Sequence, residues 1–278
     1  MDKARETCKI CGDRAELAFT KQVILKYDVA FFQCSRCGFI QTEKPYWLPE
    51  TYESSLFALD TGLIARPLSL SSMVDWMIMR HFDPRGRFLD YGGGSGIFVR
   101  LMRDRGFHFF RYDKFVKNIY ALCFDLSDLR EEDRKFEMVT SFEVLEHFEN
   151  PLEELAEMFS RSSTVLCSTL LQPADADLRD GWWYFGELHG QHISFYTRKS
   201  MEIIARHFGC YYYSNGSDLH LFSKQKMKNV AFRATPVLDR FSQLIAGLTG
   251  RRRQPHPESL TMKDAEWIKE QFRRGSLL

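Results

Sequence analysis

The chain has 278 residues, of which 44% are hydrophobic and 27% are charged, and its formal net charge is +1. This is the composition of an ordinary globular protein, and no run approaches the roughly eighteen apolar residues of a membrane span. The amino terminus lacks a signal-peptide pattern, which predicts a cytoplasmic protein. The charge is uneven, because residues 224–278 carry twelve Lys or Arg against five Asp or Glu. The remainder is mildly acidic, which disfavours a nucleic-acid partner.

Residues 1–50 carry two CxxC pairs, separated by 22 residues and each followed by glycine. The four thiols are Cys8, Cys11, Cys34 and Cys37. Short strands that end in such knuckles place four sulfurs tetrahedrally around Zn²⁺. Four thiolates leave no open position, so we expect a small zinc-ribbon-like module with a structural metal.

From residue 51 onwards, predicted strands and helices alternate. Helical spacing of apolar residues or glycine stops predicts helices at 66–82, 97–106, 151–162 and 197–210. Strands are predicted at 87–92, 108–113, 121–126 (the weakest), within 136–148, at 164–171 and as a hairpin over 211–224. This order predicts an α/β domain over 51–225 with a Rossmann-like, doubly wound, seven-stranded sheet. Residues 226–278 are expected to form a basic, partly helical tail.

The stretch RFLDYGGGSGIF (87–98) joins the first strand of this domain to a helix. Gly92, Gly94 and Gly96 read GxGxG, whereas a dinucleotide loop reads GxGxxG. Asp90 precedes the glycines and would repel a diphosphate, but it suits a cationic ligand such as S-adenosylmethionine. Asp113 ends the next strand, where a carboxylate can accept ribose hydroxyls.

With these motifs the chain resembles the class I S-adenosylmethionine-dependent methyltransferases, in the bacterial form with an amino-terminal four-cysteine zinc module. The resemblance covers roughly residues 5–225. It implies that the cofactor is bound by the glycine loop, by Asp113, by Asp125 and Leu126 beside the adenine, and by Ser141, Phe142 and Glu143 at the methionine end. Residues 182–200 resemble the substrate-side insert of enzymes that methylate sugars or other small polar metabolites.

An acceptor hydroxyl must lose a proton, and histidine suits that task at neutral pH. We expect His192 to be the base, His189 to assist or to bind substrate, and His147 to be a weaker catalytic candidate. Glu143 and His147 are spaced by one helical turn and are expected to face the cofactor, with Glu146 pointing elsewhere. Expected substrate-binding residues are Trp182, Trp183, Tyr184 and Gln191. Arg103, Arg105 and Arg111 are interpreted as a solvated rim.

The leading hypothesis is O-methylation of a sugar or glycan precursor. Carbon methylation of a sugar is an alternative, although a sugar C-methylating relative has tyrosine where this chain has His189. A second alternative is an RNA methyltransferase that grips phosphates with the zinc module and basic tail, and a third is a non-catalytic cofactor-binding scaffold. The pattern does not specify the acceptor atom or the oligomeric state.

Overall fold

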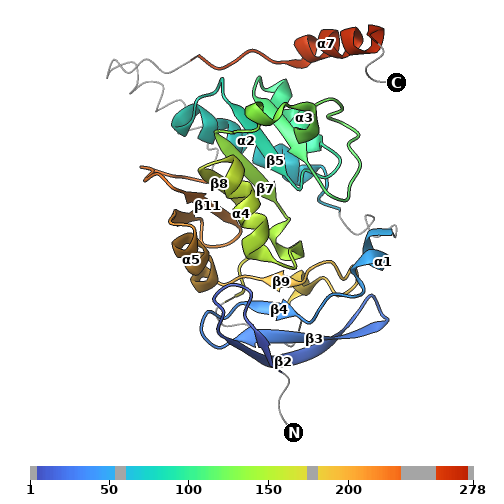
Figure 1. The fold of residues 1–278 in the computed structure, drawn as a ribbon, viewed down its shortest axis with the longest axis vertical. Coiled ribbons are helices and arrows are strands. Elements are labelled where there is room, and N and C mark those ends of the chain that lie inside the picture. Colours follow the sequence, from blue (N-terminus) through green and yellow to red (C-terminus); the bar gives the residue numbers. More distant parts are fainter. Residues whose placement is uncertain (1–4, 54–60, 174–180, 233–254, 275–278) are drawn as a thin grey trace. The chain divides into compact units, whose positions relative to one another are not determined.

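The computed structural model describes residues 5–53, 61–173, 181–232 and 255–274 (Figure 1). The chain divides into two compact units. Unit 1 comprises residues 1–61 and 139–226, and unit 2 comprises residues 62–138 and 227–278. In the described residues, no helix combines the length and apolarity needed to cross a membrane.

Unit 1 begins with a five-stranded antiparallel sheet in the order β1-β2-β3-β4-β9. Its strands are β1 (Arg5–Thr7), β2 (Arg14–Val23), β3 (Tyr27–Cys34), β4 (Ile40–Thr42) and β9 (Ser194–Phe195). The last strand comes from far along the chain, since Ile40 pairs with Phe195. The expected amino-terminal module therefore shares a sheet with the segment that carries His192. Helix α1 (Leu48–Glu53) follows β4.

Apolar side chains of this sheet and of the later segment form one aromatic cluster. Alternation along β3 turns Val29 and Phe31 inward, as its β-branched and aromatic composition predicts. The cluster consists of Val23, Val29, Phe31, Ile40, Trp47, Trp182, Tyr184, Phe185, Ile193 and Phe195. Large rings of this kind contribute much of the burial energy of a small sheet.

The rest of unit 1 is built on a mixed sheet with the strand order β10-β11-β8-β7. Its strands are β7 (Met138–Phe142, starting at the unit boundary), β8 (Thr164–Ser168), β10 (Tyr211–Ser214) and β11 (Leu219–Ser223). β7 and β8 are parallel, and β11 runs antiparallel to β8 and to β10. The helices are α4 (Pro151–Arg161), α5 (Arg198–His207) and the short 3₁₀ turns η4 (Leu145–His147) and η5 (Trp183–Phe185).

Unit 2 carries the parallel strands β5 (Arg87–Tyr91) and β6 (His108–Tyr112), with Asp90 opposite Arg111. Its helices are α2 (Ala65–His81), α3 (Ile97–Asp104) and α7 (Thr261–Arg273), with 3₁₀ turns η2 (Leu126–Asp128) and η3 (Glu131–Asp133). Helix α3 starts after Gly96 and buries Phe98, Val99 and Met102. Asp264 of α7 is paired with Arg103 of α3, so part of the basic tail is a docked helix.

The expected Rossmann-like α/β fold with its terminal hairpin is confirmed, with one difference in strand number. The described residues contain six strands of this sheet. The weakest expected strand, at 121–126, is reduced to a single parallel bridge between Arg111 and Asp125. The reason is local, since Cys123 has a φ of +70° and breaks the extended backbone.

Candidate functional site

The glycine loop of unit 2 turns sharply after β5. Gly92, Gly94 and Gly96 have φ of +74°, +54° and +91°, which side-chain-bearing residues rarely adopt. A Cβ at Gly94 would have no neighbour within 4 Å, so open space lies above this residue. A Cβ at Gly93 would instead lie 2.7 Å from Cγ of Arg111. The loop therefore packs closely on its inner side and leaves its backbone accessible at Gly94, as a cofactor cradle requires.

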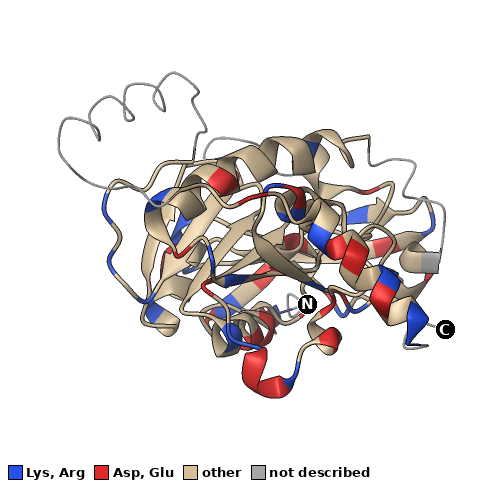
Figure 2. Ribbon diagram, turned by 90° about the horizontal axis from the view of Figure 1, so that it is seen from above, with Lys and Arg blue, Asp and Glu red and all other residues tan. Residues whose placement is uncertain are grey.

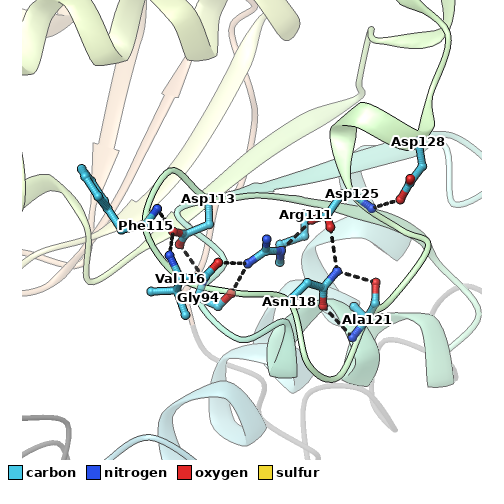
Figure 3. A network of polar contacts seen from close by, with 9 residues as sticks. All are labelled: Gly94, Arg111, Asp113, Phe115, Val116, Asn118, Ala121, Asp125 and Asp128. Atoms are coloured by element: carbon cyan, nitrogen blue, oxygen red, sulfur yellow. Dashed lines mark hydrogen bonds and ion pairs between the residues drawn. The ribbon is translucent and has the colours of Figure 1, made fainter. Parts of the chain in front are cut away.

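The Arg111 side chain lies between the glycine loop and Asp125 and is hydrogen-bonded to both (Figure 3). The side chain of Arg111 is buried, and its Nε donates to Asp125 Oδ1 at 2.6 Å. Its Nη1 donates to the carbonyls of Gly94 and Val116. The interpretation of Arg111 and Arg103 as a solvated rim is therefore wrong, because each guanidinium is buried against a carboxylate.

The two acids predicted to bind ribose and adenine are largely occupied by this network. Asp113 Oδ1 accepts the N–H groups of Phe115 and Val116, and its Oδ2 accepts that of Gly94 at 2.9 Å. A carboxylate oxygen has two lone-pair directions, so Oδ2 can accept one more hydrogen bond. Asp125 accepts hydrogen bonds from Arg111 and from Asn118 Nδ2. Its neighbour Leu126 is buried at the start of η2.

In unit 1, the segment after β7 is strained. Glu143 has a φ of +55°, a conformation that costs a non-glycine residue about 1–3 kcal/mol. Ser168 holds it, because Ser168 Oγ accepts the Glu143 N–H at 2.8 Å and donates to its carboxylate at 2.5 Å. The expected helical turn from Glu143 to His147 is therefore wrong, and only η4 is helical. Ser141 is fully buried, and Phe142 ends the strand half-buried.

The histidines follow on two segments of unit 1 that are hydrogen-bonded together. Ile193 N–H donates to the Glu146 carbonyl at 2.8 Å, and Ser194 Oγ donates to the Phe148 carbonyl at 2.7 Å. These bonds place the rings of His147 and His192 at a centroid distance of 5.0 Å. Glu146 does not point elsewhere, as its helical spacing predicted. Its carboxylate is fully buried, 4.0 Å from His192 Nε2.

Backbone carbonyls fix the tautomer of both rings. Nδ1 of His192 donates to the Tyr184 carbonyl at 2.6 Å, and Nδ1 of His147 donates to the Gln191 carbonyl at 3.0 Å. A carbonyl can only accept, so in the neutral ring Nε2 carries the lone pair. Burial, reinforced by His147 and His189, holds the pKa of His192 well below its usual value of 6.5. His189 is turned differently, with Nδ1 accepting the Gln191 N–H at 3.2 Å.

The expected substrate-binding aromatics differ in exposure. Trp182 and Tyr184 are buried in the aromatic cluster, whereas Trp183 is 75% exposed. Of these three rings, Trp183 alone is open to a ligand from solvent. The side chain of Gln191 donates to the Thr51 carbonyl at 3.1 Å, which ties it to α1.

The amino-terminal sheet braces the histidine segment directly, which the sequence did not indicate. Trp47 Nε1 donates to the Gly190 carbonyl at 2.8 Å, and Thr42 N–H donates to the Ile193 carbonyl at 3.1 Å. Thr197 Oγ1 donates to the carbonyl of Cys37, itself one of the clustered cysteines. Partners so far apart in the chain leave no local sequence pattern. The one usable signal is Trp47, a large aromatic residue close to the second CxxC pair, which suggests a packing partner elsewhere in the chain.

The four expected cysteines lie together, with their Sγ atoms within 4.8 Å of one another. The Sγ separations are 3.6 Å for Cys8–Cys37, 3.4 Å for Cys11–Cys34 and 3.7 Å for Cys11–Cys37. A Zn–S bond of about 2.3 Å in a tetrahedron gives sulfurs about 3.8 Å apart. The cluster therefore has the dimensions that a tetrathiolate metal site requires.

A family model described as a methyltransferase domain matches residues 71–215. Among solved structures, the chain is similar to the plantazolicin methyltransferase in complex with SAH, with 14% identity over 63% of this chain and 90% of that one (TM-score 0.42). It is also similar to the magnesium protoporphyrin IX methyltransferase of Synechocystis PCC 6803 with bound SAM, with 14% identity over 58% and 81% (TM-score 0.38). No curated protein matches the sequence. Because the family model spans just over half of the chain, the chain belongs to the class I S-adenosylmethionine-dependent methyltransferases.

Proposed function

We propose that the chain transfers a methyl group from S-adenosylmethionine to a hydroxyl of a small polar acceptor, most suitably a sugar or glycan precursor. The observation that carries this proposal is the fixed imidazole of His192. Its Nδ1–H is held by the Tyr184 carbonyl at 2.6 Å, so the Nε2 lone pair is the one available for a proton. Such a preset base serves a hydroxyl acceptor.

The residues of the glycine loop fit the cofactor. Gly94 leaves room for a ligand against the backbone, and Asp113 Oδ2 retains one acceptor direction for a ribose hydroxyl. Asp90 and Asp113 favour a cationic ligand over a diphosphate. When bound, S-adenosylmethionine supplies a methyl group that is electrophilic because it is attached to a sulfonium. In unit 1, the buried Ser141 hydroxyl has no hydrogen-bond partner among the described residues, and we assign it to the same ligand together with Phe142 and Glu143.

His192 takes the proton in the proposed reaction. As the acceptor oxygen bonds to the methyl carbon and the carbon–sulfur bond breaks with its electrons on sulfur, the hydroxyl proton passes to Nε2. The resulting imidazolium keeps its Nδ1–H on the Tyr184 carbonyl, and its charge develops 4.0 Å from the Glu146 carboxylate. We assign His189 and Gln191 to the edge of the acceptor site, where they link to each other through the Gln191 N–H.

Two observations support a sugar over RNA as the acceptor. The exposed ring of Trp183 offers a surface on which a sugar face can stack. Figure 2 shows acidic and basic residues interspersed along the described chain, not a continuous basic stripe that would follow a phosphate backbone.

We further propose that the four cysteines hold a structural Zn²⁺. The sulfur separations support this, and four thiolates complete a tetrahedral shell with no position for substrate.

The test is transfer of labelled methyl from S-adenosylmethionine to a panel of nucleotide sugars and lipid-linked glycans, with total RNA as a separate arm. We expect a labelled sugar hydroxyl, and a loss of about 10²–10⁴-fold in kcat for His192→Ala. The matched control is His207→Ala, which changes an exposed histidine of α5 in the same unit. Full activity of His192→Ala would refute the base assignment. A label on carbon or RNA would refute the acceptor assignment, and absence of cofactor binding in calorimetry would refute the proposed activity.

A further inference from the structure

The group formed by Glu146, His147 and His192 has a property that the proposed reaction does not use. One ligand atom from each of these three side chains lies within 4.8 Å of the others. A carboxylate oxygen and two imidazole nitrogens are the donor set that zinc-like divalent metals prefer when thiolates are absent. The group lies in unit 1 and shares no residue with the cysteine cluster.

The hydrogen bonds that the two histidines make through Nδ1 are those typical of metal-binding histidines. Each ring donates Nδ1–H to a backbone carbonyl, of Tyr184 for His192 and of Gln191 for His147. Histidines that bind metals nearly always donate their second nitrogen in this way, because the bond fixes both the tautomer and the orientation of the ring. In both rings the lone pair is consequently on Nε2, the nitrogen that for His192 lies 4.0 Å from the Glu146 carboxylate.

The backbone also holds the three residues in place. The Ile193 N–H donates to the Glu146 carbonyl, and Tyr196 Oη donates to the Leu145 carbonyl, both at 2.8 Å. Bonds of about 2.0–2.1 Å to a tetrahedral ion would place the ligand atoms about 3.4 Å apart. The carboxylate and the rings, whose ligand atoms lie within 4.8 Å of one another, therefore need to close by about 1.4 Å at most, a movement that side-chain rotation supplies.

We propose that Glu146, His147 and His192 form a second metal site, which binds a divalent transition metal of the zinc class and by doing so blocks the base. The inhibitory role rests on the proposed function, since the metal takes the same Nε2 lone pair of His192 that would accept the acceptor proton. The remaining coordination positions would be filled by water.

The test titrates the full chain with Co²⁺, a spectroscopic substitute for Zn²⁺, in the absence of cofactor and acceptor. We expect two equivalents to bind, one with the intense thiolate charge-transfer bands of the cysteine cluster and one without them. Glu146→Gln should leave the first equivalent unchanged and weaken the binding of the second. Its affinity for the second equivalent should fall by more than the 10- to 100-fold that loss of an outer-shell partner costs. The retained thiolate bands show that unit 1 of the variant is folded, and the exposed-histidine variant His207→Gln should bind both equivalents.

Binding of a single equivalent by the unaltered chain, or of two by Glu146→Gln, would overturn the site. A second measurement separates this from the proposed function. Zn²⁺ beyond the first equivalent should abolish methyl transfer. If two equivalents bind and transfer continues, the metal site stands as a non-inhibitory one, the inhibitory role is refuted, and so is the assignment of His192 as the base.

Discussion

The glycine loop of unit 2 and the histidine segment of unit 1, the two proposed sites, are assembled from different distances along the chain. The loop is fastened by near neighbours, since Asp113 lies 19 residues from Gly94 and Asp125 lies 14 from Arg111. The histidine segment is fastened from afar, with Trp47 and Gly190 separated by 143 residues. The difference indicates that the proposed cofactor site depends on one local motif, whereas the proposed acceptor site depends on the amino-terminal sheet.

Removal of the proposed zinc should have the largest effect, and it should disrupt the histidine segment but not the glycine loop. Cys34→Ser, or chelation, is expected to unfold the amino-terminal sheet, because structural zinc contributes about 10–16 kcal/mol to folding in small modules. Since that sheet holds Gly190 and Ile193, acceptor methylation should be lost while the glycine loop persists. Hydrogen exchange measures this, with deprotection expected at residues 5–42 and 187–196 and continued protection in β5 and β6. Loss of protection in both units would contradict the separation, and Cys210→Ser is the matched control.

The second largest effect is expected in unit 2. Arg111→Ala leaves the Asp125 carboxylate without its guanidinium and removes the support of the Gly94 carbonyl, a change that costs about 3–5 kcal/mol for a buried pair. Arg111→Lys keeps the charge but lacks the several planar donors of the guanidinium, so we expect an intermediate loss of stability. Urea unfolding measures both, and calorimetry with S-adenosylmethionine should show weaker binding in the same order. Equal stability of the two variants would mean that the charge alone contributes nothing, and an Arg111→Lys variant as stable as the unaltered chain would mean that the charge alone suffices. Arg105→Ala, which removes a half-buried pair with Asp75, is the control.

Acid should act on unit 1 through His220. This ring is fully buried, and its Nε2 donates to the Thr169 carbonyl at 3.0 Å while its Nδ1 accepts from Tyr212 Oη at 2.9 Å. Burial lowers its pKa to about 4. The folded state therefore binds the proton less well than the unfolded state, whose pKa is about 6.5. The stability that neutral His220 provides is fully present above pH 6.5 and is lost as the pH falls towards 4. The free energy of unfolding should therefore fall by about 2 kcal/mol between about pH 8 and pH 5.

Urea unfolding at pH 8 and pH 5 gives the loss of stability on acidification, both for the unaltered chain and for His220→Asn. The difference between these two losses is the contribution of His220. The variant should be less stable at the higher pH and should lose less stability on acidification. A pH dependence identical in the two proteins would exclude His220 as its source.

The same contrast explains which parts could be predicted from sequence. The glycine loop, Asp113 and the four cysteines are short motifs whose spacing encodes their geometry. The structure brings the four cysteines together and places the Asp113 carboxylate against the Gly94 N–H. The sequence predicts a solvated Arg111, because an arginine in a strand gives no sign that a loop carbonyl and the aspartate 14 residues later will cover it. Helical spacing predicts that Glu146 points away from Glu143 and His147, but the positive φ of Glu143 interrupts that helix. A run of aromatic residues predicts a ligand surface at Trp182 and Tyr184, and only tertiary packing reveals that both belong to the core.

The smallest expected effect compares two adjacent glycines of the loop. Gly93→Ala places a methyl 2.7 Å from Arg111 Cγ and 2.8 Å from Asp90 Oδ2, an overpacking that costs about 1–3 kcal/mol. Gly94→Ala meets no atom within 4 Å and carries only the strain of its positive φ, about 1 kcal/mol. If the open space above Gly94 belongs to the cofactor, the milder substitution should nevertheless weaken S-adenosylmethionine binding at least as much as the harsher one. Thermal unfolding and calorimetry on the two variants decide this, and affinity losses that merely follow the stability losses would mean that the cofactor does not approach Gly94.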